Sequence, residues 1–217
     1  MRFIFEQIRC GGDRNFAYLI GDREEKVGAL VDPSYDPKGV VARAQAQGLT
    51  LKYIINTHGH PDHINGNAKA KKLTGAEIAA YKDSDISPDV PLEDGQELSI
   101  GSTTLRFLFV PGHCPDHLLI HIPDQKIAVT GDLLFVGKIG GTSTDDLARI
   151  EYESLERALH ALPDDTTIWP GHDYGCRPSS TIALEKANNP FLLMKNLDEF
   201  LDLKRNWPIF KEEHGLK

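Results

Sequence analysis

The chain has 217 residues, a length that suits one large domain or one domain with a short appendage. Hydrophobic residues make up 40% of it and charged residues 26%, which is typical of globular proteins and argues against disorder and fibrous repeats. Acidic residues outnumber basic ones by 32 to 24, so the net charge is −8. Because phosphate contacts need a concentrated cationic face, this balance argues against nucleic acid as a partner.

The first strands and helices are predicted from apolar runs and the turn residues between them. Gly-Gly-Asp and Gly-Asp turns separate three apolar runs at the N-terminus, which predicts a β-meander. A helix is then expected between the capping residue Asp36 and Gly48. The expected strands in this half are 3–8, 16–20, 27–31, 51–56 and 76–81, with a helix at 64–74 and an exposed loop at 83–97.

The second half continues with strands and then becomes helical. The expected strands are 98–101, 103–110, 117–122, 126–130 and 166–169, and the expected helices are 152–162, 179–187 and 197–205. Elements in such blocks indicate an α+β fold in which two packed sheets carry helices outside. Asn189-Pro190 is a possible hinge, which divides the chain into a domain over 1–190 and a short helical extension over 191–217.

Cysteine usage and the absence of long apolar runs bear on the compartment. Cys10, Cys114 and Cys176 lie far apart and form no CxxC pair, which favours a reducing compartment. The N-terminus has acids and glycines where a signal peptide needs an unbroken apolar core. No apolar run approaches the roughly 20 residues of a membrane span. We therefore expect a cytoplasmic protein, monomer or homodimer, without a membrane partner.

Metal-capable side chains follow the ends of four predicted strands. The strand at 51–56 runs into a His-x-His-x-Asp-His motif, and three later strands end in glycine followed by His or Asp. Imidazole nitrogens with carboxylates suit Zn²⁺, Fe²⁺ or Mn²⁺ and require no thiolate. Within the motif, the alternating histidines can hold one ion and the next two residues can face a second, while a shared carboxylate can bridge them. The predicted ligands are His58, His60, Asp62, His63, His113, Asp132 and His172.

The stretches THGHPDHINGN, VPGHCPDH, TGD and PGHDY resemble the metallo-β-lactamase-fold hydrolases, and within them the glyoxalase II group and its sister group, the persulfide dioxygenases. The similarity runs from about Asn15 to Pro190. It implies a four-layer αβ/βα sandwich that forms the catalytic domain. It also implies two ion sites, with Asp132 as the bridge. The implied first set is His58, His60 and His113, and the implied second set is Asp62, His63 and His172.

The resemblance implies hydrolysis at two divalent ions, with zinc favoured and iron or manganese as alternatives. A hydroxide between the ions, oriented by Asp62, would attack the carbonyl of a small-molecule thioester such as an S-acylglutathione. The alternative function is a mononuclear iron persulfide dioxygenase, because those enzymes retain the second-site ligand types. Lactone and β-lactam hydrolysis also occur in the superfamily. A metal-binding module without turnover is disfavoured, since ligand sets with open positions rarely serve structure alone.

The substrate-binding stretch departs from the glyoxalase II pattern. That group places Gly-Cys-Gly-Arg or Gly-Cys-Gly-Lys after the bridging Asp to bind glutathione, whereas Gly141 takes the basic position here. Lys138 lies nearby and is the expected replacement contact. Tyr174, two residues after His172, matches a family substrate-contact position, with a packing aromatic as the alternative. We expect His117 to support the ligands and Asp32 to fix a turn below the site.

Overall fold

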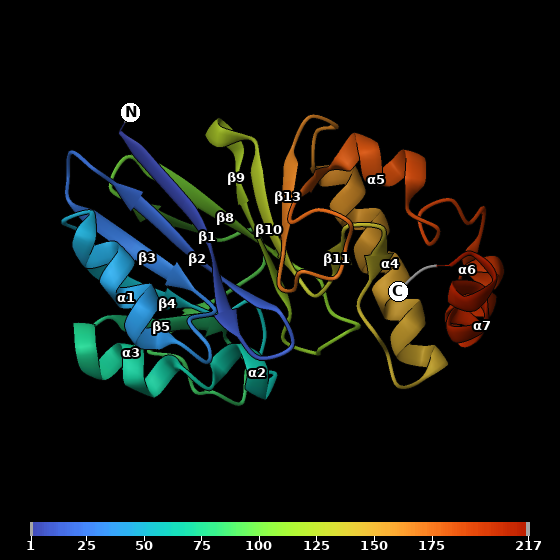
Figure 1. The fold of residues 1–217 in the computed structure, drawn as a ribbon, viewed down its shortest axis with the longest axis horizontal. Helices are drawn as coiled ribbons and strands as arrows, with labels where there is room; N and C mark the ends of the chain where they lie inside the picture. The colour runs from blue at the N-terminus through green and yellow to red at the C-terminus, as the bar shows by residue number, and fades with distance from the viewer. Residues whose placement is uncertain (1, 216–217) are drawn as a thin grey trace.

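The computed structural model describes residues 2–215 and confirms the α+β sandwich. Two six-stranded mixed sheets pack face to face, and helices cover their outer faces (Figure 1). The apolar layer between the sheets includes Phe16, Ile20, Phe107 and Ile120, which are almost completely buried. Removal of this apolar surface from water is the main stabilising term, at about 25 cal/mol for each Å² buried.

The first sheet begins with the predicted meander and ends in parallel strands. Strands β1 to β3 are antiparallel, and β3 to β6 then run parallel to one another. The bounds are β1 Phe3–Gly11, β2 Asn15–Asp22, β3 Val27–Val31, β4 Thr50–Ile55, β5 Glu77–Tyr81 and β6 Val90–Leu92.

Two helices cover the outer face of this sheet. Helix α1 (Pro37–Ala46) is capped as predicted, because the Asp36 side chain accepts a hydrogen bond from the Gly39 amide. The expected helix at 64–74 begins later, as α3 (Asn67–Thr74), and a separate short helix, α2 (Pro61–Ile64), precedes it. Gly66 stands at this break, against the Pro33 carbonyl, where a Cβ atom would lie 1.7 Å from the oxygen. The break lets α2 carry the end of the histidine motif while α3 packs on the sheet.

The second sheet has the order β14-β13-β10-β9-β8-β7, and in it only β10 and β13 are parallel. A two-stranded hairpin, β11–β12, follows β10. The bounds are β7 Glu97–Ile100, β8 Thr103–Phe109, β9 Leu118–Ile122, β10 Ile127–Gly131, β11 Leu134–Phe135, β12 Lys138–Ile139, β13 Thr167–Pro170 and β14 Ser180–Thr181, with a 3-10 turn at Pro123–Gln125.

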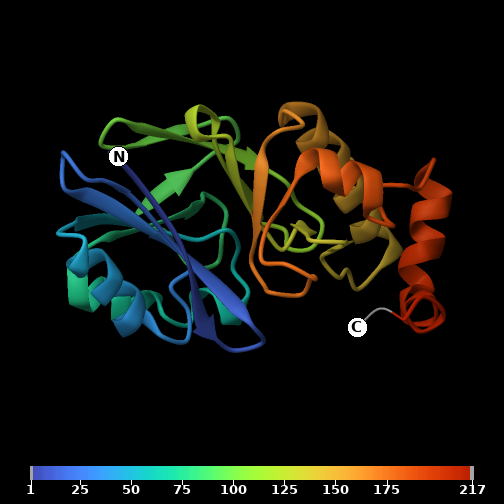
Figure 2. The same ribbon diagram turned by 45° about the horizontal axis from the view of Figure 1, so that its top comes forward.

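Helices α4 (Asp145–Ala161) and α5 (Ile182–Asn188) cover the second sheet, and α6 (Leu197–Arg205) and α7 (Trp207–Glu213) pack beyond them (Figures 1 and 2). Phe191 and Phe200 belong to the same apolar cluster as Leu119 of the sheet. The side chain of Asn189 is buried and donates a hydrogen bond to the Lys138 carbonyl, so the expected hinge is held against the hairpin.

Several expected boundaries are corrected. The loop expected at 83–97 contains β6, which pairs with β5 as an edge strand. The helix expected at 152–162 begins earlier, at Asp145, because Thr144 caps it by accepting from the Leu147 amide. The helical extension continues past the predicted helix at 197–205 into a further helix, α7, where Phe210 packs on the cluster of the second sheet. None of the helices within residues 2–215 is long and apolar enough to cross a membrane.

Candidate metal centre

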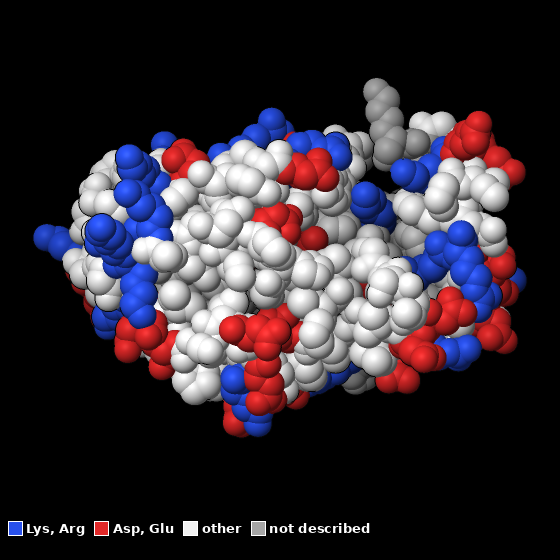
Figure 3. All heavy atoms as spheres, turned by 90° about the horizontal axis from the view of Figure 1, so that it is seen from below, with Lys and Arg blue, Asp and Glu red and all other residues white. Residues whose placement is uncertain are grey.

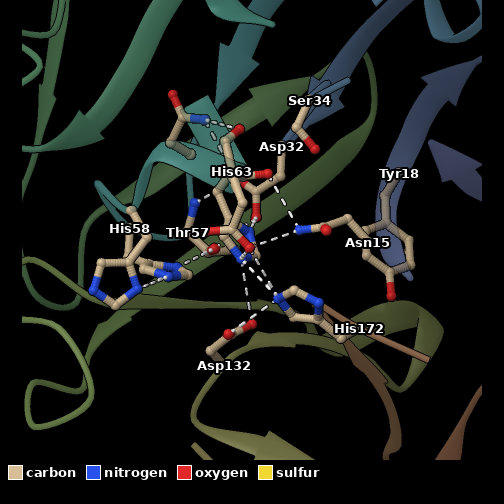
Figure 4. A network of polar contacts seen from close by, with 12 residues as sticks. Asn15, Tyr18, Asp32, Ser34, Thr57, His58, His63, Asp132 and His172 are labelled. Carbon is tan, nitrogen blue, oxygen red and sulfur yellow. Dashed lines mark hydrogen bonds and ion pairs between the residues drawn. The ribbon is translucent and has the colours of Figure 1, made fainter. Parts of the chain in front are cut away.

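Four strands deliver metal-capable side chains to one edge of the sandwich. The chain leaves β4 before His58, β8 before His113, β10 before Asp132 and β13 before His172. Figure 4 shows the side chains of His58, His63, Asp132 and His172 turned toward a common region. All seven residues predicted as ligands lie together there.

Two of three groups of neighbouring donor atoms match the sets that the resemblance implies, and the third joins His58, His63 and Asp132. In one group, the Nδ1 atom of His60 lies 3.0 Å from Nε2 of His58 and 3.0 Å from Nε2 of His113. In the other, Nε2 of His63 and Nε2 of His172 are 3.2 Å apart. Asp62 completes the second group, with its Oδ2 atom 3.4 Å from Nε2 of His172. Within each group every donor atom lies within 4.8 Å of the others.

Asp132 lies between the two groups. Its Oδ2 atom is 3.3 Å from Nε2 of His172 and 3.6 Å from Nε2 of His113. Its Oδ1 atom is 3.5 Å from Nε2 of His63, and among residues 2–215 it has no hydrogen-bond partner although it is buried. A buried carboxylate oxygen needs a compensating partner, and a cation is such a partner. This position fits the bridging role predicted for Asp132.

The site is electrostatically suited to cations. Burial lowers the pKa of His58 and His113, so both rings are neutral, as ligation requires. Burial opposes ionisation of Asp132, but His63 and His172 outweigh it and hold the pKa of Asp132 well below its usual value. In the same way, Asp132 overcomes the effect of burial and raises the pKa of His63 and His172. Asp132 is therefore a buried anion that attracts positive charge, either protons or metal ions.

Three of the histidine rings are oriented through the nitrogen that faces away from the site. His113 donates from Nδ1 to the Gly141 carbonyl at 2.7 Å, and His172 donates from Nδ1 to the Asp13 carbonyl at 2.8 Å. His63 places Nδ1 3.0 Å from Oδ2 of Asp32. Such partners fix the tautomer and direction of metal-binding imidazoles.

Asp32 does more than the turn-fixing role expected from the sequence. Its carboxylate accepts hydrogen bonds from the Thr57 amide at 2.9 Å and from the Thr57 hydroxyl at 2.6 Å, in addition to facing His63 (Figure 4). The residue therefore joins the end of β3 to the start of the histidine motif. Its backbone φ of +46° is unusual for a residue other than glycine and is held by these contacts.

Two further residues hold the ligands in place. Asn15, which is not among the predicted site residues, donates from Nδ2 to Oδ2 of Asp62 at 3.0 Å. No local motif marks it, because the contact joins β2 to α2, 47 positions further along the chain. His117 accepts a hydrogen bond at Nε2 from the Asp132 amide at 3.0 Å, which fits the supporting role predicted for it. Burial lowers the pKa of His117 to about 3, so the ring is neutral.

A cavity of about 540 Å³ opens beside His113 and Asp132. Lys138 and Tyr174, the predicted substrate contacts, both line it. The Tyr174 ring stacks on His172 with centroids 4.6 Å apart, and Nζ of Lys138 lies 4.1 Å from the Tyr174 centroid. The cavity is closed on the other side by residues from α6 and α7, namely Lys204, Arg205, Trp207 and Lys211. Figure 3 shows basic side chains around a hollow beside the C-terminal helices.

The residues present fit divalent metal ions. Each group offers three nitrogen or oxygen donors from His and Asp, and several imidazole nitrogens face one another across gaps of 3.0–3.2 Å. Such donor sets suit zinc, iron or manganese. His58, His60 and His113 would hold one ion, and Asp62, His63 and His172 would hold the other.

Comparison with known proteins agrees with the fold. The family model for the metallo-β-lactamase superfamily matches residues 10–172. The chain therefore belongs to the metallo-β-lactamase superfamily and is an enzyme of that superfamily.

Among curated proteins, the human mitochondrial persulfide dioxygenase ETHE1 is 32% identical over 209 residues, which cover 95% of this chain and 80% of that protein. The hydroxyacylglutathione hydrolase of Pelagibacter ubique is 32% identical over 206 residues, with 93% and 84% covered. The crystal structure of ETHE1 from Myxococcus xanthus superposes with a TM-score of 0.87 at 31% identity and covers 94% of this chain and 91% of that chain. Both groups of enzymes named by the sequence resemblance are thus represented.

Proposed function

We propose that this protein is a dinuclear metallohydrolase that cleaves a thioester of the S-acylglutathione type. The observation that carries the proposal is the position of Asp132 between two complete three-donor groups. A second group built around Asp62 is needed for hydrolysis at two ions. Because persulfide dioxygenases retain the same ligand types, the number of ions bound per chain is what separates the two reactions. When bound, divalent cations acidify water and polarise a carbonyl oxygen.

The chain's own residues supply orientation and substrate binding. The Asp62 side chain is 34% exposed, and Asn15 fixes its carboxylate, so it can accept a hydrogen bond from the attacking water. Asp132 holds its charge between both groups. Because the leaving thiolate is stable near neutral pH, no strong general acid is needed.

The cavity supports an acidic thiol carrier. Neither Lys138 nor Lys211 forms an ion pair with another residue in 2–215, so both ammonium groups are available in a chain of net charge −8. Tyr174 presents its ring beside Lys138. Carboxylates of a glutathione-like carrier would pair with these cations while the thioester carbonyl lies at Asp132 and His113.

A second candidate function is mononuclear iron persulfide dioxygenase. It is favoured by the broad match to ETHE1, which covers 95% of this chain in sequence and superposes closely in structure. The same cavity would then hold glutathione persulfide. Only one of the two donor groups would then hold an ion.

The variant Asp62→Ala separates the two reactions. We expect S-lactoylglutathione hydrolysis to fall by at least about 100-fold, because the second group loses its carboxylate. A dioxygenase would keep its oxygen uptake with glutathione persulfide and its single iron. Metal content per chain would be measured on both proteins purified without added metal, with Asp85→Ala, an exposed acid outside the site, as control. A wild-type protein with about one iron and no hydrolysis would refute the proposed hydrolase.

A further inference from the structure

One buried pair of opposite charges joins α4 and α6 beside the metal centre. The Glu151 side chain, on α4, has no exposed surface, and that of Lys204, on α6, is only 11% exposed. The Lys204 ammonium contacts Oε2 of Glu151 and donates a second hydrogen bond to the Gly140 carbonyl at 3.1 Å. The pair therefore reaches the segment that follows the β11–β12 hairpin.

The segment Gly140–Gly141 lies between this pair and the ligand His113. The Gly141 carbonyl accepts the Nδ1 hydrogen of His113 at 2.7 Å. A Cβ atom at Gly140 would lie 2.1 Å from the Asp132 carbonyl and 2.8 Å from Nδ1 of His113. The backbone here thus packs directly on two predicted ligands on one side, and its Gly140 carbonyl is held by Lys204 on the other.

Stability alone does not account for the pair. Replacement of a buried ion pair by apolar residues of similar size is often neutral or stabilising, because two charges must be removed from water. Moreover, Oε1 of Glu151 has no hydrogen-bond partner among residues 2–215. Two consecutive glycines also have wide backbone freedom, so their carbonyls need an external contact to keep one direction.

We propose that Lys204 and Glu151 are positioning residues for the metal ligand His113. Glu151 holds the Lys204 ammonium, the ammonium fixes the Gly140 carbonyl, and the fixed backbone keeps the Gly141 carbonyl in line with Nδ1 of His113. The C-terminal helix α6 thereby contributes to metal affinity without touching the metal. This inference rests on the proposed metal centre and holds for either candidate reaction.

Three variants test it, namely Lys204→Met, Glu151→Gln and the double variant Glu151→Met/Lys204→Met. Zinc affinity is measured by competition with a chromophoric chelator, and Tm is measured on the metal-free proteins. Lys204→Met should lower the affinity for one of the two zinc ions by about 10-fold to 100-fold, the usual effect of losing a contact that orients a ligand. Glu151→Gln should have a smaller effect, because glutamine still accepts from the ammonium.

The double variant separates positioning from stability. Its metal-free Tm should equal or exceed that of Lys204→Met, since no unpaired charge stays buried. Its zinc affinity should nevertheless stay as low as that of Lys204→Met. Affinity and Tm would thus change in different ways across the series.

Arg205→Met is the matched control, because Arg205 is the next residue on α6 and forms an exposed ion pair with Asp145 of α4. It joins the same two helices without contacting Gly140, so zinc affinity should stay within about twofold of the wild type. Wild-type affinity in Lys204→Met, or affinities that follow Tm across all variants including Arg205→Met, would overturn the positioning role. A wild-type chain that binds no metal would overturn the metal centre, and this inference with it.

Discussion

Phe200 provides the strongest test of whether the C-terminal helices pack as part of the same folded domain as the two sheets. Its side chain, on α6, is completely buried, and its ring lies 5.1 Å from Tyr152 of α4 and 5.9 Å from Phe191. Truncation of a buried phenylalanine to alanine removes about 3–5 kcal/mol of stability. In a chain of this size, each kcal/mol corresponds to roughly 2–4 °C in Tm, so Phe200→Ala should lower Tm by roughly 6–20 °C.

Urea and thermal unfolding of the metal-free protein would measure this change. Unfolding should stay a single transition with an unchanged m-value, because the cluster around Phe200 continues into the second sheet. Ile209→Ala, at a side chain 56% exposed on α7, is the control and should change stability by no more than about 0.5 kcal/mol. A loss below about 1 kcal/mol for Phe200→Ala, or a separate early transition, would refute this packing argument and indicate an independent extension.

Three further predictions concern the site and the core. Asp32→Asn weakens the acceptor at Nδ1 of His63 and should lower zinc affinity by about 10-fold to 100-fold in a chelator competition; unchanged affinity would contradict the orienting role. Gly66→Ala places a Cβ atom 1.7 Å from a backbone oxygen and should lower the free energy of unfolding by about 1–3 kcal/mol, whereas Gly141→Ala, with nothing within 4 Å, should be near neutral. Cys176 is exposed while the other two thiols are buried, so Ellman's reagent should modify only Cys176 in the folded protein and all three after denaturation; rapid reaction of a second thiol would contradict this assignment.

The sequence predicted the elements whose signals are local. Helix α6 spans Leu197–Arg205, which are the predicted bounds, because Asn196 caps it and its apolar residues repeat at helical spacing. The first turns of α4 have mostly polar residues, and one of them, Glu151, is buried by tertiary contacts that include Lys204 of α6, so the periodicity did not indicate a helix there. Strand β6 has only three residues, and it is a strand because it pairs with β5. The Asp, Ser and Pro residues around it indicated a loop, since that pairing is not visible in the local sequence.

The candidate site likewise contains residues that a local sequence signal marks and residues that no local signal marks. The spacing His58-x-His60-x-Asp62-His63 is a local signal. The other three predicted ligands each follow a strand and a glycine, so the topology alone brings them to one edge. The residues that orient these ligands gave no such signal. Asn15 meets Asp62 across 47 positions of sequence, and Lys204 meets Gly140 across 64. Contacts of this kind depend on how helices and strands pack, which periodicity does not specify.

Packing explains the glycine at position 140, but the departure at Gly141 has no steric cause, because a Cβ atom there would meet nothing within 4 Å. A side chain on the neighbouring Gly140 would collide with the Asp132 backbone, and the Gly141 carbonyl holds His113. The segment therefore orients the metal ligand His113, while the positive charge in the cavity comes from the Lys138 ammonium, on β12, beside Tyr174. Moving the positive charge from the glycine segment to the hairpin keeps an ammonium near the expected position of a substrate carboxylate. Residues of α6 and α7 line the other side of the cavity. In the proposed function, the C-terminal helices would therefore select the thiol carrier, and the ions at the strand ends would determine the reaction.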